Sequence, residues 1–361
     1  MTNSQADLAG RTIRPLVAGF AVLVLATSAC GSSSDEPTAE ATTTAAPTSA
    51  PSSTSTAPPS TTTVAPTTTA APASGPVEVQ ETRVEVGEFT FDAAVAGPPD
   101  GELVVLLHGF PQTWNQWRHQ IETLAGAGYY VLAPNQRGYS ADARPPAVED
   151  YTIDLIVGDL IGMVDAVGRN QFHVVGHDFG GAVVWEAAVA HPDRVASVTS
   201  VSTPHLAAMA AALADPASDQ ADRSAYFATF SAEGSEELFI ANDAALLRQL
   251  YAQAGITGED LEAQLAVLSN EDAMRSALNW YRASGINESV LGPVTIPTMY
   301  IWSDADDALG PDAAAATGDH VTGPYRFEVL EGVNHWVPEQ APEDVSNLLV
   351  EFLAEQPPIQ G

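Results

Sequence analysis

Short apolar runs that alternate with helical patterns constrain the fold of this chain more than any other feature of its sequence. Runs typical of buried strands occupy residues 103–107, 130–133, 172–175, 195–201 and 298–302, and helical patterns lie between them at residues 114–125, 153–167 and 180–190. This alternation predicts an α/β fold, with a mostly parallel central sheet and helices on both faces. Residues 77–95 alternate apolar and polar side chains, which predicts an antiparallel edge.

The alternation breaks between residues 202 and 293. Alanine-rich and acidic helical stretches follow one another there without a strand between them. Open α/β sheets bind ligands beyond the carboxyl ends of their strands. We therefore interpret the insertion as a helical lid over those ends and place it at about residues 204–293.

The first 30 residues have the features of an export signal. Arg11 and Arg14 precede an apolar run at 15–26, which is short for a membrane span and typical of a signal-peptide core. Residues 27–30 (TSAC) resemble the lipobox of bacterial lipoproteins, whose cysteine becomes the lipid-modified first residue, although Thr27 stands where that family usually has leucine. We expect a protein tethered to the outer face of a bacterial membrane through Cys30, or a secreted one if the cysteine is incidental.

Residues 31–75 form a linker by composition. Of these 45 residues, 39 are Ser, Thr, Pro or Ala. Such a segment buries too little apolar surface to offset the entropy lost on ordering. The sequence therefore predicts a disordered tether followed by a folded domain at residues 76–361.

The charge balance excludes several classes of function. The chain carries 46 acidic residues against 13 basic ones, all of them arginines, for a formal charge of −33. Binding a phosphate backbone needs a clustered basic surface, so we expect no nucleic-acid partner and no membrane contact beyond the lipid anchor. With one cysteine, no histidine pair at metal-ligand spacing and no glycine-rich nucleotide motif, we expect neither a metal nor a cofactor.

A carboxylate occupies the centre of a predicted strand–turn–helix motif. The segment 176–180 (GHDFG) matches the spacing of the G-x-S-x-G nucleophile elbow, with Asp178 in place of serine. Small flanking residues favour a tight turn that exposes the central side chain above the sheet. We predict that Asp178 is a nucleophile, the alternative being a surface carboxylate at a helix N-terminus.

An acid and a histidine follow in the chain order that resembles the α/β-hydrolase fold. The segment 302–307 (WSDADD) ends a predicted strand, and His335 lies in a loop before the final predicted helix. In that family the acid usually lies four residues after a tryptophan at this strand end, which selects Asp306, with Asp304 and Asp307 as rivals. The resemblance implies that Asp306 orients His335 and that His335 is the general base.

The motif 108–111 (HGFP) ends an upstream strand and resembles the turn that supplies an oxyanion-hole amide in α/β-hydrolases. The resemblance implies that the backbone N–H groups of Phe110 and Phe179 face the oxygen on which negative charge develops. His108 precedes the turn, and we interpret it as a structural residue that hydrogen-bonds the loop.

An aspartate nucleophile narrows the chemistry. An ionised carboxylate attacks an sp³ carbon bearing a leaving oxygen or halide and forms an alkyl ester on the enzyme, which a histidine-activated water then hydrolyses. This disfavours a carboxylesterase or a lipase. It leaves epoxide opening, which needs a proton donor such as a phenol, or carbon–halogen cleavage, which needs N–H donors for the halide.

Two tyrosines in the predicted lid are candidates for the proton donor that epoxide opening needs. Tyr226 begins the segment 226–234 (YFATFSAEG), and Tyr281 lies in 278–282 (LNWYR). Both segments resemble lid motifs of soluble epoxide hydrolases, in which two tyrosines hydrogen-bond the epoxide oxygen, and the resemblance covers nearly all of residues 76–361. It implies an enzyme that converts a small apolar epoxide and water to a vicinal diol. Tyr251 is the reserve candidate for a proton donor.

Two alternatives remain open. Haloalkane dehalogenases use a similar nucleophile, acid and histidine, but Phe179 and Phe110 stand where they usually have tryptophan and asparagine. Neither phenylalanine has a side-chain donor for a halide, whereas Trp280 and Trp336 are candidate halide ligands. The second alternative is a non-catalytic, envelope-tethered domain that binds an apolar ligand.

Overall fold

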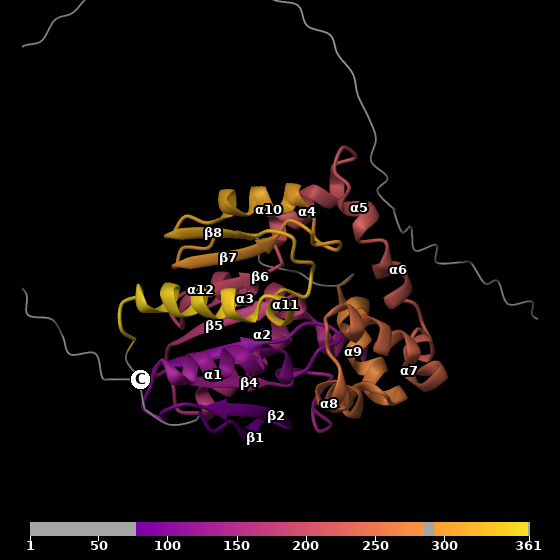
Figure 1. Ribbon diagram of the computed structural model, residues 1–361, viewed down its shortest axis with the longest axis horizontal. Helices are drawn as coiled ribbons and strands as arrows, with labels where there is room; N and C mark the ends of the chain where they lie inside the picture. Colours follow the sequence, from indigo (N-terminus) through magenta and orange to yellow (C-terminus); the bar gives the residue numbers. More distant parts are fainter. Residues whose placement is uncertain (1–76, 285–291, 360–361) are drawn as a thin grey trace, which may run out of the picture. The chain divides into compact units, whose positions relative to one another are not determined.

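The computed structural model describes residues 77–284 and 292–359. These residues form one eight-stranded sheet with the order β1-β2-β4-β3-β5-β6-β7-β8 (Figure 1). The strands are β1 (Gln80–Val86), β2 (Phe89–Ala96), β3 (Leu103–Leu107), β4 (Tyr130–Pro134), β5 (Phe172–His177), β6 (Val195–Val201), β7 (Thr298–Ser303) and β8 (Tyr325–Leu330). Strands β3 to β8 are parallel, and β1 and β2 form an antiparallel edge. The predicted mostly parallel sheet is confirmed.

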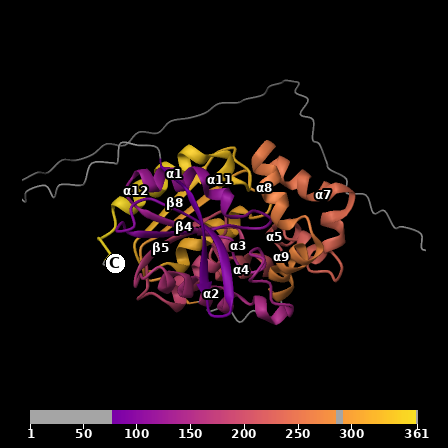
Figure 2. The ribbon, with the colours of Figure 1, turned by 90° about the horizontal axis from the view of Figure 1, so that it is seen from below.

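Helices cover both faces of the sheet (Figure 2). The helices packed on it are α1 (Arg118–Gly126) and α12 (Pro342–Ala354) on one face, and α2 (Ile153–Ala166) and α3 (Phe179–Ala190) on the other. Because successive strand residues point to opposite faces, Val104 of β3 packs in the apolar cluster with α1 and α12, whereas Val105 packs in the cluster with α2 and α3. All five residues of β3 are buried, which explains its unbroken apolar run.

The predicted helical insertion lies between β6 and β7. Its described residues form α4 (Leu206–Ala214), α5 (Gln220–Arg223), α6 (Tyr226–Phe230), α7 (Glu236–Gln253), α8 (Gly258–Leu268) and α9 (Glu271–Ala283), which we call the lid. Helices α6 to α9 lie together at one side of the sheet, on the right in Figure 1. The indole N–H of Trp280 in α9 donates to the carbonyl of Arg137 after β4 at 2.9 Å, so the lid is joined to the core by a buried hydrogen bond.

The remaining elements are short. They are the 3₁₀ helices η1 (Trp114–Trp117), η2 (Val148–Tyr151) and η3 (Thr317–His320) and the helices α10 (Pro311–Ala316) and α11 (Val337–Gln340). The single helix predicted at residues 114–125 is therefore η1 followed by α1. The side chain of Thr113 accepts from the N–H of Asn115 at 3.4 Å and caps the tighter first segment. Strand β5 extends two residues beyond its apolar run, because Gly176 and His177 pair with β6.

The predicted signal peptide, Cys30 and the linker at residues 31–75 lie outside the described residues. Among the residues that are described, no helix combines the length and the apolarity needed to cross a membrane.

Candidate active site

Asp178 lies in the sharp turn between β5 and α3. Its backbone adopts φ 52° and ψ −120°, a conformation that a non-glycine residue rarely takes and that costs on the order of 1–3 kcal/mol. The turn is so tight that a Cβ at Gly176 would lie 2.1 Å from the carbonyl oxygen of Gly180. The hydroxyl of Thr203, just after β6, donates to the Asp178 carbonyl at 2.7 Å. The GHDFG segment therefore folds as the predicted elbow.

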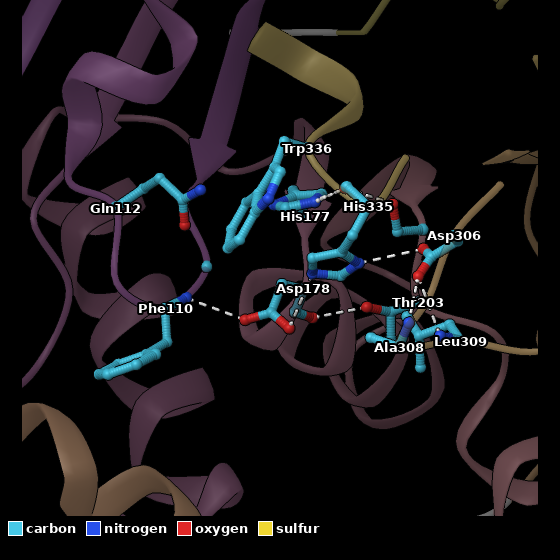
Figure 3. Close-up of polar contacts among 12 residues, drawn as sticks. Phe110, Gln112, His177, Asp178, Thr203, Asp306, Ala308, Leu309, His335 and Trp336 are labelled. Carbon is cyan, nitrogen blue, oxygen red and sulfur yellow. Dashed lines mark hydrogen bonds and ion pairs between the residues drawn. The ribbon is translucent and has the colours of Figure 1, made fainter. Parts of the chain in front are cut away.

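Asp306 and His335 lie in the loops that follow β7 and β8. Figure 3 shows both side chains next to the carboxylate of Asp178. The His335 Nε2 lies 3.5 Å from Asp178 Oδ2, and its Nδ1 lies 3.0 Å from Asp306 Oδ2. The other oxygen of Asp306 accepts from the backbone N–H groups of Ala308 and Leu309 at 2.8 and 2.9 Å. The rivals Asp304 and Asp307 are both exposed, and Asp304 instead accepts from the N–H of Gly332. Of the three acids, Asp306 is the one in contact with His335.

The protonation states of Asp178, His335 and Asp306 depend on one another. Burial lowers the pKa of His335, but the carboxylates of Asp306 and Asp178 on either side outweigh burial and hold the pKa well above 6.5. Burial likewise raises the pKa values of both acids, and the hydrogen bonds and positive charge of His335 reverse that effect, so both pKa values lie below 3.8. Two carboxylates on either side of the imidazole therefore favour its protonated form, and the imidazole in turn favours the ionised form of both acids.

The predicted turn at residues 108–111 lies against Asp178. The N–H of Phe110 donates to Asp178 Oδ1 at 2.9 Å. A Cβ at Gly109 would lie 2.4 Å from the Cβ of Asp178, so glycine permits this approach. No hydrogen bond from the N–H of Phe179, the second predicted donor, is found within the described part of the chain. His108 accepts from the N–H of Gln136 at 3.1 Å through Nε2, in agreement with its predicted structural role.

The two predicted lid tyrosines come together beside the nucleophile. Tyr226 in α6 and Tyr281 in α9 have ring centroids 6.2 Å apart. Burial raises the pKa of each hydroxyl well above 10, and the charge of Asp178 raises it further. Neither hydroxyl has a hydrogen-bond partner among residues 77–284 and 292–359. The hydroxyl of Tyr251, in contrast, donates to the carbonyl of Pro111 at 2.7 Å.

Aromatic rings surround Tyr281. The centroids of Phe110, Phe179, Phe227 and Phe230 lie 5.2, 4.7, 5.0 and 5.1 Å from its own. Two of these rings belong to the core and two to the lid, so apolar side chains from both parts surround the ring of Tyr281. Within the described residues, no group of three or more His, Cys, Asp or Glu side chains is placed to hold a metal ion.

Comparison with known proteins assigns the chain to a fold family. The sequence profile of the α/β hydrolase fold matches residues 102–342. The chain belongs to the α/β-hydrolase fold family. The predicted fold class is thereby confirmed in full.

Several relatives of this hydrolase have a named activity. It is 32% identical to epoxide hydrolase A of Mycobacterium tuberculosis, over 78% of this chain and 98% of the relative, and 30% identical to mouse epoxide hydrolase 4, over 76% and 79%. The crystal structure of epoxide hydrolase A from Mycobacterium thermoresistibile matches with a TM-score of 0.69 and 30% identity, covering 78% of this chain and 99% of that one.

The hydrolase site also contains residues that sequence reasoning missed. The buried side chains of Gln112 and Gln116 and the partly buried side chain of Glu339 form a polar group next to His177, the residue before Asp178. Glutamine in a short 3₁₀ helix carries no sequence signal of its own, and Gln116 lies 61 residues from His177 and 223 from Glu339. The sequence feature that could have pointed to this polar group is the position of Gln112 directly after the 108–111 motif.

Proposed function

We propose that this hydrolase converts epoxides to vicinal diols through a covalent ester on Asp178. The observation that carries the proposal is the pair of tyrosine hydroxyls, on Tyr226 and Tyr281, which have no hydrogen-bond partner among the described residues and whose pKa values the charge of Asp178 raises. A carboxylate nucleophile needs no deprotonation, so phenol groups beside it serve the leaving oxygen instead. The relatives named epoxide hydrolase support the same reaction.

In the first step Asp178 opens the ring. The N–H of Phe110 holds Oδ1, which leaves Oδ2 to attack an epoxide carbon. The carbon–oxygen bond of the ring breaks, and the departing oxygen takes a proton from one of the two tyrosines. The imidazolium of His335 returns a proton to the tyrosinate through the water in the site, and His335 becomes neutral.

In the second step water hydrolyses the ester. Alkylation has removed the charge of Asp178, one of the two carboxylates that raise the pKa of His335, so the neutral imidazole is favoured when a base is needed. His335 takes a proton from water, and the hydroxide attacks the ester carbonyl carbon. The negative charge develops on Oδ1, to which Phe110 donates its N–H. Collapse expels the diol oxygen, which takes the proton from His335, and the new Asp178 carboxyl then gives its proton back to His335.

The site favours this reaction over dehalogenation. The indole N–H of Trp280, one of two candidate halide ligands, is used by the carbonyl of Arg137 at 2.9 Å. The side chains of Phe110 and Phe179 next to Asp178 have no donors.

The experiment measures diol formation and halide release in the same reactions, with a panel of epoxides and haloalkanes. We expect the purified protein to form diol and release no halide, and Asp178→Ala to reduce diol formation by about 10⁴-fold or more. Halide release without diol formation would assign dehalogenation instead. Diol formation by Asp178→Ala at the native rate would contradict the covalent mechanism. Binding of apolar ligands without turnover would favour the non-catalytic alternative.

We also propose that the protein is exported and anchored at the membrane through Cys30. The arginines, the apolar run and the 27–30 segment support this localisation. Fractionation of cells should recover the chain with the membrane and the Cys30→Ser variant in the soluble fraction. An unprocessed chain in the cytoplasm would contradict the proposal.

A further inference from the structure

A series of buried hydrogen bonds passes through His177, the residue before the nucleophile. It starts at the backbone N–H of Gly109, which donates to Oε1 of Gln116 at 3.2 Å. Nε2 of Gln116 lies 2.8 Å from Nδ1 of His177, and Nε2 of His177 lies 2.9 Å from the carbonyl oxygen of His335. The side chains of Gln116 and His177 are completely buried.

The two ends of this series fix the direction of every bond within it. The N–H of Gly109 can only donate, so the oxygen of Gln116 must face it and the NH₂ group must face His177. An NH₂ group can only donate, so Nδ1 of His177 must carry a lone pair. The ring proton therefore lies on Nε2, which donates to the carbonyl of His335. His177 is held as a single neutral tautomer, and burial, assisted by the charge of His335, lowers its pKa to about 4.

Glu339 in α11 reinforces this orientation. Its carboxylate lies 3.4 Å from Nε2 of Gln116 and takes the second hydrogen of that amide. The same carboxylate accepts from Nε2 of Gln112 at 3.1 Å. Burial raises the pKa of Glu339 to about 7. In its ionised form the carboxylate is an acceptor only, and it then also requires the NH₂ group of Gln116 on this side.

These hydrogen bonds connect two groups that take part in ester hydrolysis, the second step. Gly109 precedes Phe110, whose N–H faces Oδ1 of Asp178, and His335 is the base. We propose that Gln116 is a positioning residue for ester hydrolysis, which acts by fixing the tautomer of His177 and so holding the backbone of His335 against the turn that carries Phe110. This inference rests on the function proposed above. Ring opening uses the N–H of Phe110 only to hold an Asp178 carboxylate that is already ionised, whereas ester hydrolysis needs that N–H and His335 at fixed positions relative to one another.

The kinetic experiment compares Gln116→Met with the native protein. Methionine has a similar length and makes none of these hydrogen bonds. We expect hydrolysis of the alkyl-enzyme to slow by about 10- to 100-fold, as for a base misplaced by up to an ångström, while single-turnover alkylation of Asp178 changes by less than about threefold. The ester should then accumulate in the steady state. Equal slowing of both steps, or of neither, would overturn the proposal.

Histidine ring ¹⁵N NMR supplies a readout that needs no substrate. We expect His177, assigned by the loss of its signals in His177→Gln, to be the neutral tautomer with its proton on Nε2. Gln116→Glu combined with Glu339→Gln, so that two carboxylates do not face each other, places an acceptor where Nε2 of Gln116 donates, and a proton should then appear on Nδ1 of His177. A native His177 protonated on Nδ1, or a tautomer unchanged in this double variant, would overturn the proposal.

The two proposals fail in different ways. If the native protein forms no diol from any epoxide, the proposed function fails and the kinetic role of Gln116 fails with it, whereas the NMR result still decides its structural part. If diol forms and Asp178→Ala abolishes it, but Gln116→Met leaves the ratio of the two rates unchanged, the inference about Gln116 alone is wrong.

Discussion

At the scale of single residues, the replacement of serine by Asp178 in the elbow changes what the neighbouring histidine does. A serine nucleophile needs a base before it attacks, whereas a carboxylate is already ionised. The two carboxylates flanking His335 favour its protonated form, so in the proposed mechanism it becomes a base only after the ester has formed. The two chemical steps can therefore be separated by substitution.

Replacement of His335 should stop the reaction at the ester. In His335→Gln, Asp178 and the tyrosines remain, but no base activates water. We expect the intact mass of the protein to rise by the mass of one epoxide and to stay raised, whereas the native protein returns to its starting mass. Asp178→Ala, the control, should gain no mass, and an adduct that persists there would place the ester on another residue.

The two lid tyrosines should be needed for the first step. General-acid catalysis contributes about 10²–10⁴-fold, so with two donors sharing the oxygen we expect Tyr226→Phe and Tyr281→Phe each to slow alkylation by about 10- to 100-fold, and the double variant by more. Stopped-flow or quenched single-turnover assays give this rate.

Tyr251→Phe is the matched control for these variants. Its hydroxyl bonds to the carbonyl of Pro111, so it should lose about 1 kcal/mol of unfolding free energy and alkylate at a rate within a few fold of native. Equal slowing in all three single variants would mean that lid packing, and not proton donation, is being measured.

Residues in short motifs were predictable from sequence, and residues in the supporting network were not. Asp178, His335 and Asp306 each follow a strand at a recognisable spacing, because the sheet edge brings such loops together. The choice of Asp306 over Asp304 and Asp307 follows in the structure from burial, since the other two are exposed. Gln116 had no such signal, because its role depends on partners on elements far away in the chain.

At the scale of elements, Arg137 joins the core to the lid. Its guanidinium forms a two-pronged buried ion pair with Asp159 of α2, with both N–O distances 2.6 Å. It also donates to the carbonyl of Asp150 in η2, and its own carbonyl accepts from Trp280 of the lid helix α9. Arg137, in the loop after β4, thus connects α2, η2 and the lid. The alternating sequence pattern predicted α2 and a helical lid, but it did not predict that Arg137 connects them. Nothing in the sequence distinguishes Arg137 and Asp159 from charged residues at the surface.

Breaking this ion pair should destabilise the fold. Asp159→Ala leaves a buried guanidinium without its partner, which typically costs about 3–5 kcal/mol of unfolding free energy. Asp165→Ala is the matched control on the same helix, because Asp165 pairs with Arg194 at the surface and should cost less than about 1 kcal/mol. Urea unfolding gives both values. Equal losses in the two variants would show that burial of the Arg137 pair has no special energetic effect.

At the scale of the whole molecule, the formal charge of −33 is the dominant property. Like charges repel one another more strongly in the folded chain than in the expanded one. Raising the NaCl concentration from about 0.01 to 0.15 M shortens the screening length from about 30 to 8 Å. We expect the melting temperature to rise by about 2–4 °C over this range, which corresponds to about 1 kcal/mol for a domain of this size. A melting temperature that stays constant or falls, measured by calorimetry, would contradict this expectation.

The proposed nucleophile and the proposed proton donors occupy separable parts of the chain. Asp178, His335 and Asp306 lie at the ends of sheet strands, while both tyrosines lie in the single inserted segment that begins at Leu206 and includes α9. A change confined to that insertion would therefore alter which leaving atom is assisted without disturbing the covalent step. In the proposed mechanism, residues at the ends of the sheet strands form the ester, and residues of the insertion determine which leaving atom receives a proton.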